Sequence, residues 1–340
     1  MSDAETSSPV LMSRLQHVLL AALAMGICAY GVYAALTRTP APTMHNLSVL
    51  LRQQKYREAE QALFLRAEEG RAAFADGRLE EAQQIFAEVR QRAAEARAYA
   101  LRHPRPPHPR TLAIDEAAQR ANPVSPPART RDPDEVRFAA READAAASVA
   151  MTMLAALEEQ KKAESNEGGR PPLFTPEEAE PIEKELQLAL ERDPLQENAY
   201  LLLGWLYDRC GLLQKAAEAL EKCLALNDRR ADAYNRLGLV RIKQERHAEA
   251  FACFEKALLF SQGEGQAYRD SLYNLGAAHE ALRAGYLNSS EEGDKAAARA
   301  AAEKHRQEAI RHWRAFLESE PSSPFAAKVR EHLRRLEDLD

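Results

Sequence analysis

The feature that most constrains this chain of 340 residues is a pattern that recurs at a spacing of 34. The first copy consists of Tyr200, Leu203, Gly204, Ala216, Leu220 and Cys223. The second copy consists of Tyr234, Leu237, Gly238, Ala250, Phe254 and Ala257. Agreement at one fixed spacing predicts stacked structural units, each packed against its neighbours, rather than one continuous core.

The unit resembles the tetratricopeptide repeat, a pair of helices joined by a turn with a period of about 34 residues. The resemblance is strongest over 198–260, and it implies an α-solenoid over 175–340. Composition agrees, because only 6% of the residues are aromatic while Ala, Leu, Glu and Arg, which favour long helices, are abundant. We therefore expect an all-α fold: an N-terminal transmembrane helix, then helical hairpins, then the solenoid.

Weaker copies flank the two clear ones. A partial repeat is expected just before them, and its second helix carries Ile182, Leu186 and Ala189. A third copy follows them, marked by Leu272, Leu275 and Gly276 and then by Ala309, Trp313 and Phe316. An insertion of about 21 residues near 284–304 separates the two halves of this copy. Residues 325–339 are predicted to form a C-terminal capping helix with a polar outer face.

Near the amino terminus, residues 18–36 form a run of 19 without a charged side chain. As a helix this run would span about 28 Å, close to the hydrocarbon thickness of a bilayer. We expect a transmembrane helix here, with the lipid bilayer as its partner and a short tail over 1–17. A cleaved signal peptide or a lipoprotein modified at Cys28 fits less well, because the apolar run is long, lacks an A-x-A site and continues past Cys28.

The localisation expected from this anchor is the cell inner membrane, with a single pass. Basic residues follow the segment more than they precede it, which favours a cytoplasmic soluble domain. The three cysteines of the soluble part, without an evident pairing, favour the same side. A long domain can translocate regardless of flanking charge, so the side stays open. Arginine outnumbers lysine 35 to 11, which points to a GC-rich bacterial genome.

Between the anchor and the solenoid, 44–101 lacks proline and has apolar residues at helical spacing, which predicts a separate helical hairpin region with a turn near Asp76-Gly77. Residues 102–133 contain eight prolines and six arginines. This composition predicts a stiff, solvated linker, and the alternative is a basic stretch that contacts anionic lipid or nucleic acid. A helix is expected over 134–163.

Tetratricopeptide repeats stack so that their first helices line a concave groove, and the resemblance implies which positions face it. In this chain these are Asn198, Leu201, Trp205, Asp208 and Arg209; Asp232, Asn235, Leu239, Ile242 and Lys243; and Asp270, Tyr273, Ala277 and Glu280. Five of them would form an apolar strip, namely Leu201, Trp205, Leu239, Ile242 and Tyr273. Such a strip is typical of a partner site, so we expect a protein or peptide partner in the groove.

One alternative is that the groove is filled from within, by the helix over 134–163 or by the terminal helix.

The residues at two groove positions bear on the kind of partner. Some members of the family grip an acidic carboxyl-terminal peptide with Lys and Asn. Leu201 and Trp205 occupy those positions here, so recognition of a chaperone tail is not expected.

The sequence shows no catalytic or cofactor motif, because it contains no GxxxxGK[ST], GxGxxG, HExxH or GxSxG. The four cysteines form no CxxC pair. His305 and His312 would lie two helical turns, about 10 Å, apart, too far to share a metal without other ligands. A formal charge of −6 gives no general attraction for nucleic acid, so no nucleic-acid partner is expected.

These patterns predict a membrane-tethered scaffold or adaptor that binds a protein partner, is not an enzyme and uses no cofactor or metal. Two alternatives stay open. The chain could be a structural subunit of a membrane complex whose groove is filled internally. It could also be an enzyme with unrecognised chemistry in 44–163.

Overall fold

The computed structural model describes residues 44–103, 132–165, 173–288 and 295–338, and every regular element in these ranges is an α-helix. The tail over 1–17, the membrane helix predicted for 18–36 and most of the linker predicted for 102–133 lie outside the described residues. No helix within the four described ranges is both long and apolar enough to cross a membrane. The chain divides into two compact units, residues 1–62 with 104–128 and residues 63–103 with 129–340.

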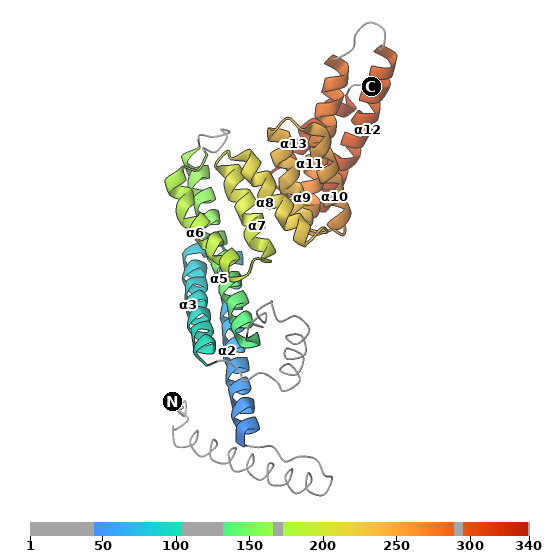
Figure 1. Cartoon of the computed structure of the whole chain (residues 1–340). Helices are drawn as coiled ribbons and strands as arrows, with labels where there is room; N and C mark the ends of the chain where they lie inside the picture. The colour runs from blue at the N-terminus through green and yellow to red at the C-terminus, as the bar shows by residue number, and fades with distance from the viewer. Residues whose placement is uncertain (1–43, 104–131, 166–172, 289–294, 339–340) are drawn as a thin grey trace, which may run out of the picture. The chain divides into compact units, whose positions relative to one another are not determined.

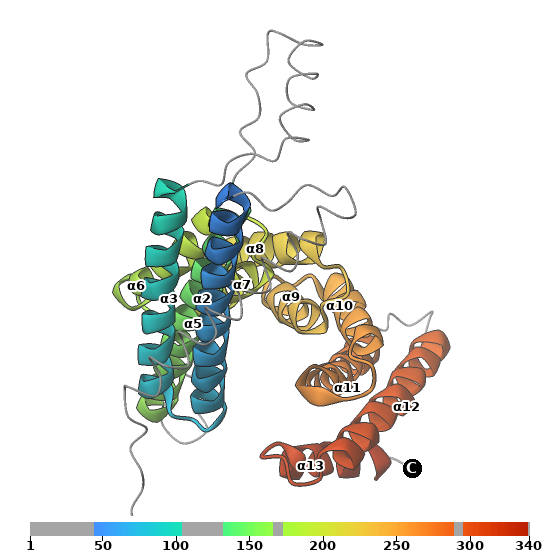
Figure 2. The same ribbon diagram turned by 90° about the horizontal axis from the view of Figure 1, so that it is seen from below.

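The helices follow one another in pairs (Figure 1). The described pairs are α2 (Met44–Ala75) with α3 (Leu79–Arg102), α5 (Pro133–Glu164) with α6 (Pro176–Arg192), α7 (Glu197–Arg209) with α8 (Leu213–Leu226), α9 (Ala231–Lys243) with α10 (His247–Phe260), and α11 (Gly265–Asn288) with α12 (Lys295–Ser319). A last helix, α13 (Ala326–Glu337), packs against α12. From α6 onward each helix packs against the next one in the chain, which is the arrangement of a solenoid (Figure 2).

Local signals explain where several helices begin. Asp132 caps α5 by accepting a hydrogen bond from the backbone N–H of Asp134, and a proline occupies the first turn. Thr175 and Glu178 form a capping box at the start of α6, each side chain accepting a hydrogen bond from the other's backbone N–H. These caps satisfy N–H groups that have no partner inside the helix.

The two helices of each clear repeat meet at a glycine. A Cβ atom added to Gly204 would lie 2.5 Å from Leu220, and one added to Gly238 would collide with Phe254. The partner follows the glycine by 16 residues in both repeats. In the third repeat Gly276 makes the same contact with Trp313, at 2.7 Å, but 37 residues separate them. The 21 additional residues equal the insertion near 284–304, of which the structure describes the ends of α11 and α12.

The amino-terminal pair shares this geometry. A Cβ atom added to Gly70 in α2 would lie 2.8 Å from Phe86 in α3, and Phe86 again follows the glycine by 16 residues. The turn after α2 also matches, because Gly77 has φ 76° and Gly211, in the turn after α7, has φ 75°. Both values lie in the left-handed region that glycine adopts without steric cost.

The helix predicted over 134–163 corresponds to α5, and it connects the hairpin region predicted over 44–101 to the helices that follow. α5 packs against α3 on one side and against α6 and α7 on the other, so it forms the first helix of a pair with α6. A buried ion pair fixes this junction. Glu142 of α5 accepts hydrogen bonds from Nε of Arg97 in α3, at 2.6 Å, and from Nε of Arg192 in α6, at 3.0 Å. The proline-rich stretch hid the continuity, because it breaks the 34-residue spacing.

The glycine contact predicts opposite effects for the same substitution at two helical glycines. Gly70→Ala should lower the free energy of unfolding by about 1 to 3 kcal/mol, because the new methyl overlaps the buried ring of Phe86. Gly285→Ala in α11 meets no atom within 4 Å, and should raise it by up to about 1 kcal/mol through helix propensity. Urea unfolding followed by circular dichroism measures both. Equal midpoints for the two variants would contradict the assignment of Gly70.

The turn after α9 predicts a stabilising substitution. Glu245 has φ 62° and follows the turn glycine Gly211 by 34 residues, so it adopts the left-handed conformation without being glycine. Glu245→Gly should raise the free energy of unfolding by about 0.5 to 1 kcal/mol, since removing Cβ relieves more strain than the added chain entropy costs. The denaturation midpoint checks this. Gly211→Ala is the reciprocal control and should lower the midpoint.

Candidate functional site

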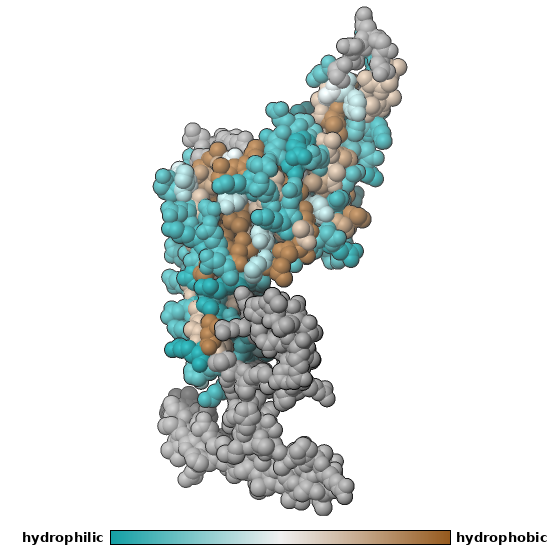
Figure 3. Space-filling view, in the orientation of Figure 1, coloured by the Kyte–Doolittle hydropathy of each residue, from teal (hydrophilic) through white to brown (hydrophobic). Residues whose placement is uncertain are grey.

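The first helices of successive pairs lie next to one another. α7 packs against α5 and α9, and α9 packs against α11. The side chains on the common face of these first helices form the candidate groove. In the face drawn in Figure 3, hydrophobic residues gather over the middle helices and are bordered by hydrophilic ones. This face therefore combines apolar contact area with polar edges, as partner-binding surfaces do.

A hollow of about 640 Å³ lies between α9, α11 and the connection from α12 to α13, and we call it the central hollow. Leu239, Tyr273 and Phe325 supply its apolar lining, and the first and last of these are 43% and 56% exposed. Tyr273 is held in place by aromatic contacts with Trp313, Phe316 and Phe325, at ring-centroid distances of 5.2, 5.8 and 5.5 Å. The hollow thus has apolar walls that remain accessible.

Trp205 of α7 lies between two neighbouring helices. Its indole Nε1 donates a hydrogen bond to Oε1 of Glu158 in α5, at 3.2 Å. On α9, the guanidinium of Arg236 lies 4.2 Å from the centre of the indole ring, within range of a cation–π interaction. Glu158 also pairs with Nε of Arg209, at 2.6 Å. α5 therefore lines the groove beside α7 as a neighbouring first helix.

Arg236 is the groove residue that sequence reasoning missed. It lines the central hollow, and among the described residues no carboxylate lies within ion-pairing distance of its guanidinium. Burial lowers its pKa, and the carboxylates of Asp232, Asp208, Asp270 and Glu158 oppose that shift without neutralising the charge. Burial likewise raises the pKa of Asp270. The signal in the sequence for this position is that Arg236 directly follows Asn235, a predicted groove residue.

The predicted groove residues differ in exposure. Asn198, Leu239 and Ile242 are exposed, whereas the half-buried ones are Trp205, Arg209, Asp232, Lys243 and Tyr273. Two of the polar ones, Lys243 and Asp232, form ion pairs within the chain. Lys243 donates to both carboxylate oxygens of Asp208, at 2.6 and 2.7 Å, and Arg230 holds Asp232 at 3.0 Å.

Two predicted groove residues are buried, and their side chains make their main contacts within the chain. Leu201 packs in the core between the first two clear repeats, against Leu220 and Leu237. Asn235 donates hydrogen bonds from Nδ2 to the carbonyl of Ala267, at 2.9 Å, and to Oγ of Ser271, at 3.1 Å, and so ties α9 to α11. The positions implied by the family resemblance include side chains that face the groove and side chains that face the next first helix. Leu201 and Asn235 are of the second kind.

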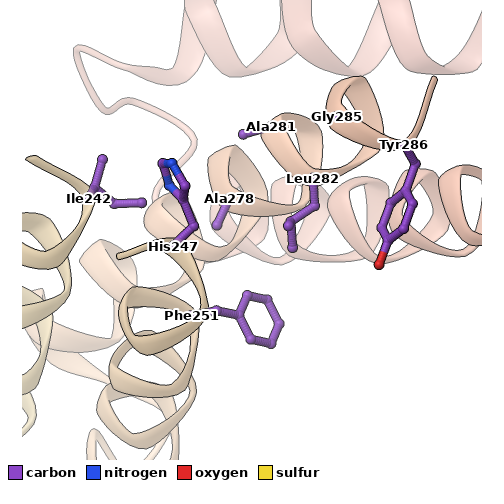
Figure 4. A pocket seen from close by; sticks show the side chains of 8 residues that line it. All are labelled: Ile242, His247, Phe251, Ala278, Ala281, Leu282, Gly285 and Tyr286. Carbon is purple, nitrogen blue, oxygen red and sulfur yellow. The ribbon is translucent and has the colours of Figure 1, made fainter. Parts of the chain in front are cut away.

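Ile242 belongs to a different site. It lines an apolar pocket of about 450 Å³ formed by the end of α9, the start of α10 and the second half of α11. The other lining residues are His247, Phe251, Ala278, Ala281, Leu282, Gly285 and Tyr286 (Figure 4). The expected continuous strip is therefore divided between the central hollow and this apolar pocket.

Comparison with known proteins agrees with the repeat geometry. The family described as "Tetratricopeptide repeat" matches residues 197–229 and 231–262. No curated protein matches the chain in sequence.

Among solved structures, MamA is 16% identical with a TM-score of 0.39, over 73% of this chain and 96% of that one. TTC0263, a thermophilic TPR protein of Thermus thermophilus, is 16% identical with a TM-score of 0.40, over 82% and 98%. YrrB, described as a TPR protein with an unusual peptide-binding site, is 17% identical with a TM-score of 0.31, over 56% and 92%.

Because these TM-scores are low, the assignment depends on the repeat match together with the glycine contacts of the helix pairs. The family match covers α7 with α8 and α9 with α10, and the same two pairs carry the glycine contacts of Gly204 and Gly238. This chain therefore contains two tetratricopeptide repeats, at residues 197–229 and 231–262.

Proposed function

We propose that the protein is a scaffold that binds an extended segment of a partner protein in the central hollow. Tetratricopeptide-repeat proteins generally act in protein–protein interaction, through the concave face of the stacked pairs. The observation that carries the proposal is the pairing, in one hollow, of accessible apolar side chains with an arginine that has no ion-pair partner among the described residues.

This combination suits a segment that carries both an apolar and an anionic group. Leu239 and Phe325 would bury an apolar side chain of the partner, while Arg236 would bind a carboxylate or a backbone carbonyl. Aspartates around the hollow disfavour a densely acidic segment, because Asp232 and Asp270 would repel it. The partner expected is therefore mainly apolar with a single anionic group near its anchor.

The proposal includes a tether. The uncharged run over 18–36 has the length of one membrane crossing, so it would hold the scaffold at the cell membrane. Support for this part comes from the sequence alone. The helices around the groove would then recruit a partner close to the bilayer.

The enzyme alternative finds no support among the described residues of 44–163. The charged side chains that meet between these helices form ion pairs that join them, as Glu142 does with Arg97 and Arg192, and as Arg66 of α2 does with Glu88 of α3. A structural subunit remains the second candidate, because Trp205 and Tyr273 already have contacts within the chain.

Partner binding predicts a difference between two exposed leucines. Leu239→Asp places a charge in the central hollow and should weaken a bound partner by about 2 kcal/mol or more, roughly thirtyfold. Leu259→Asp changes a leucine of α10 that is 72% exposed and lies outside the hollow, and it should leave binding unchanged. Affinity capture with the full-length protein, with the bound chains quantified by mass spectrometry, gives the comparison. If both variants retain the same partners, the hollow is not the binding site.

The tether predicts a fractionation result. Full-length protein in membranes should stay in the pellet after carbonate extraction, because 18–36 would be embedded in lipid. A matched chain that begins at Met44 should appear in the supernatant. Release of the full-length chain by carbonate would contradict the tether while leaving the groove proposal unaffected.

A further inference from the structure

Three histidines of the third repeat meet between α11 and α12. Nδ1 of His279 in α11 lies 2.8 Å from Nδ1 of His305 in α12. The ring of His279 also stacks on that of His312, with centroids 5.5 Å apart and planes inclined by 14°. The expectation that His305 and His312 are too distant to share a metal considered α12 alone. α11 places His279 beside both of these rings.

Glu308 completes the cluster, because it precedes His312 by one helical turn on the same face of α12. The ligand atoms of His279, Glu308 and His312 all lie within 4.8 Å of one another. Bonds of about 2.0 to 2.2 Å to a tetrahedral zinc ion place neighbouring ligand atoms about 3.4 Å apart, so small side-chain rotations suffice. We propose that His279, Glu308 and His312 bind a zinc ion.

The environment of the two imidazoles agrees with this use. Both are buried, at 6% and 5% exposure. A neutral imidazole has one ring nitrogen with a lone pair that can bind a metal. Two imidazoles and one carboxylate form a donor set that zinc favours, with a fourth position for water.

The charges that act on the histidines are one carboxylate and two cations. Glu308 provides the one negative charge, and its Oε2 also pairs with the guanidinium of Arg311 at 2.6 Å. Arg311 is 69% exposed, so solvent screens its repulsion of a bound cation. Lys304 is the other cation whose field reaches the histidines. A carboxylate has two oxygens, so Glu308 can hold Arg311 with one and a metal with the other.

His305 would orient a ligand rather than bind the metal. Its Nδ1 contact engages Nδ1 of His279, which leaves Nε2 of His279 as the coordinating nitrogen. The ring of His305 stacks on Tyr286, at 5.4 Å, and Phe251 meets the ring of His279 edge-on, at 4.9 Å. Tyr286 and Phe251 both line the apolar pocket of Figure 4. Zinc would therefore join α11 to α12 next to the wall of that pocket.

Titration calorimetry of the metal-free full-length protein with zinc sulfate at pH 7.5 tests the proposal. One zinc ion per chain should bind, with a Kd of about 1 μM or tighter. Cobalt(II) in place of zinc should give the strong visible absorption of a tetrahedral site. Glu308→Gln keeps the side chain's shape while removing its charge, and should weaken zinc binding by about tenfold or more.

His247 in α10 is exposed and lies outside the cluster, which makes His247→Ala the control, with zinc binding equal to that of the unaltered protein. His312→Ala should abolish binding, and Glu308→Gln decides the question if loss of that buried ring prevents folding. Absence of zinc binding by the unaltered protein would overturn the proposal. Equal affinity of Glu308→Gln and the unaltered protein would overturn it as well.

Discussion

The arrangement of helices in this protein depends on the absence of one methyl group in each of three repeats. Where Gly204, Gly238 and Gly276 face Leu220, Phe254 and Trp313, the two helices approach more closely than any other residue would permit. With one face of each second helix packed against its own first helix, another face packs against the next pair. The first helices are then placed side by side, and their common face carries Trp205, Arg236 and Tyr273 toward the groove.

The repeat spacing was sufficient to predict the helix pairs from α7 to α10 and the second half of α12. It was sufficient because the glycine and its large partner are separated by a fixed number of residues within one unit, so the contact is visible in the sequence. Gly70 and Phe86 have the same separation. They were not recognised as a repeat because the proline-rich stretch before α5 and the long connection to α6 remove the regular spacing to the next pair.

Other features depend on contacts between units, which spacing within a unit does not reveal. The burial of Leu201 comes from the next helix pair, and that of Asn235 comes from Ser271 in α11. The guanidinium of Arg236 in α9 lies over the indole ring of Trp205 in α7, which is again a contact between units. The histidine cluster was hidden by the insertion, because the residues that meet across α11 and α12 are shifted by 21 positions relative to the other repeats.

The ion pair at the junction of α3, α5 and α6 constrains the order in which its members can change during evolution. Glu142 is 5% exposed in its side chain, whereas Arg97 and Arg192 are 19% and 30% exposed. Loss of either arginine leaves the carboxylate with its other partner. Loss of Glu142 first leaves two partly buried cations without their shared partner, which is more costly. Descendants of this sequence should therefore replace an arginine before the glutamate, so that the acid is the last of the three to change.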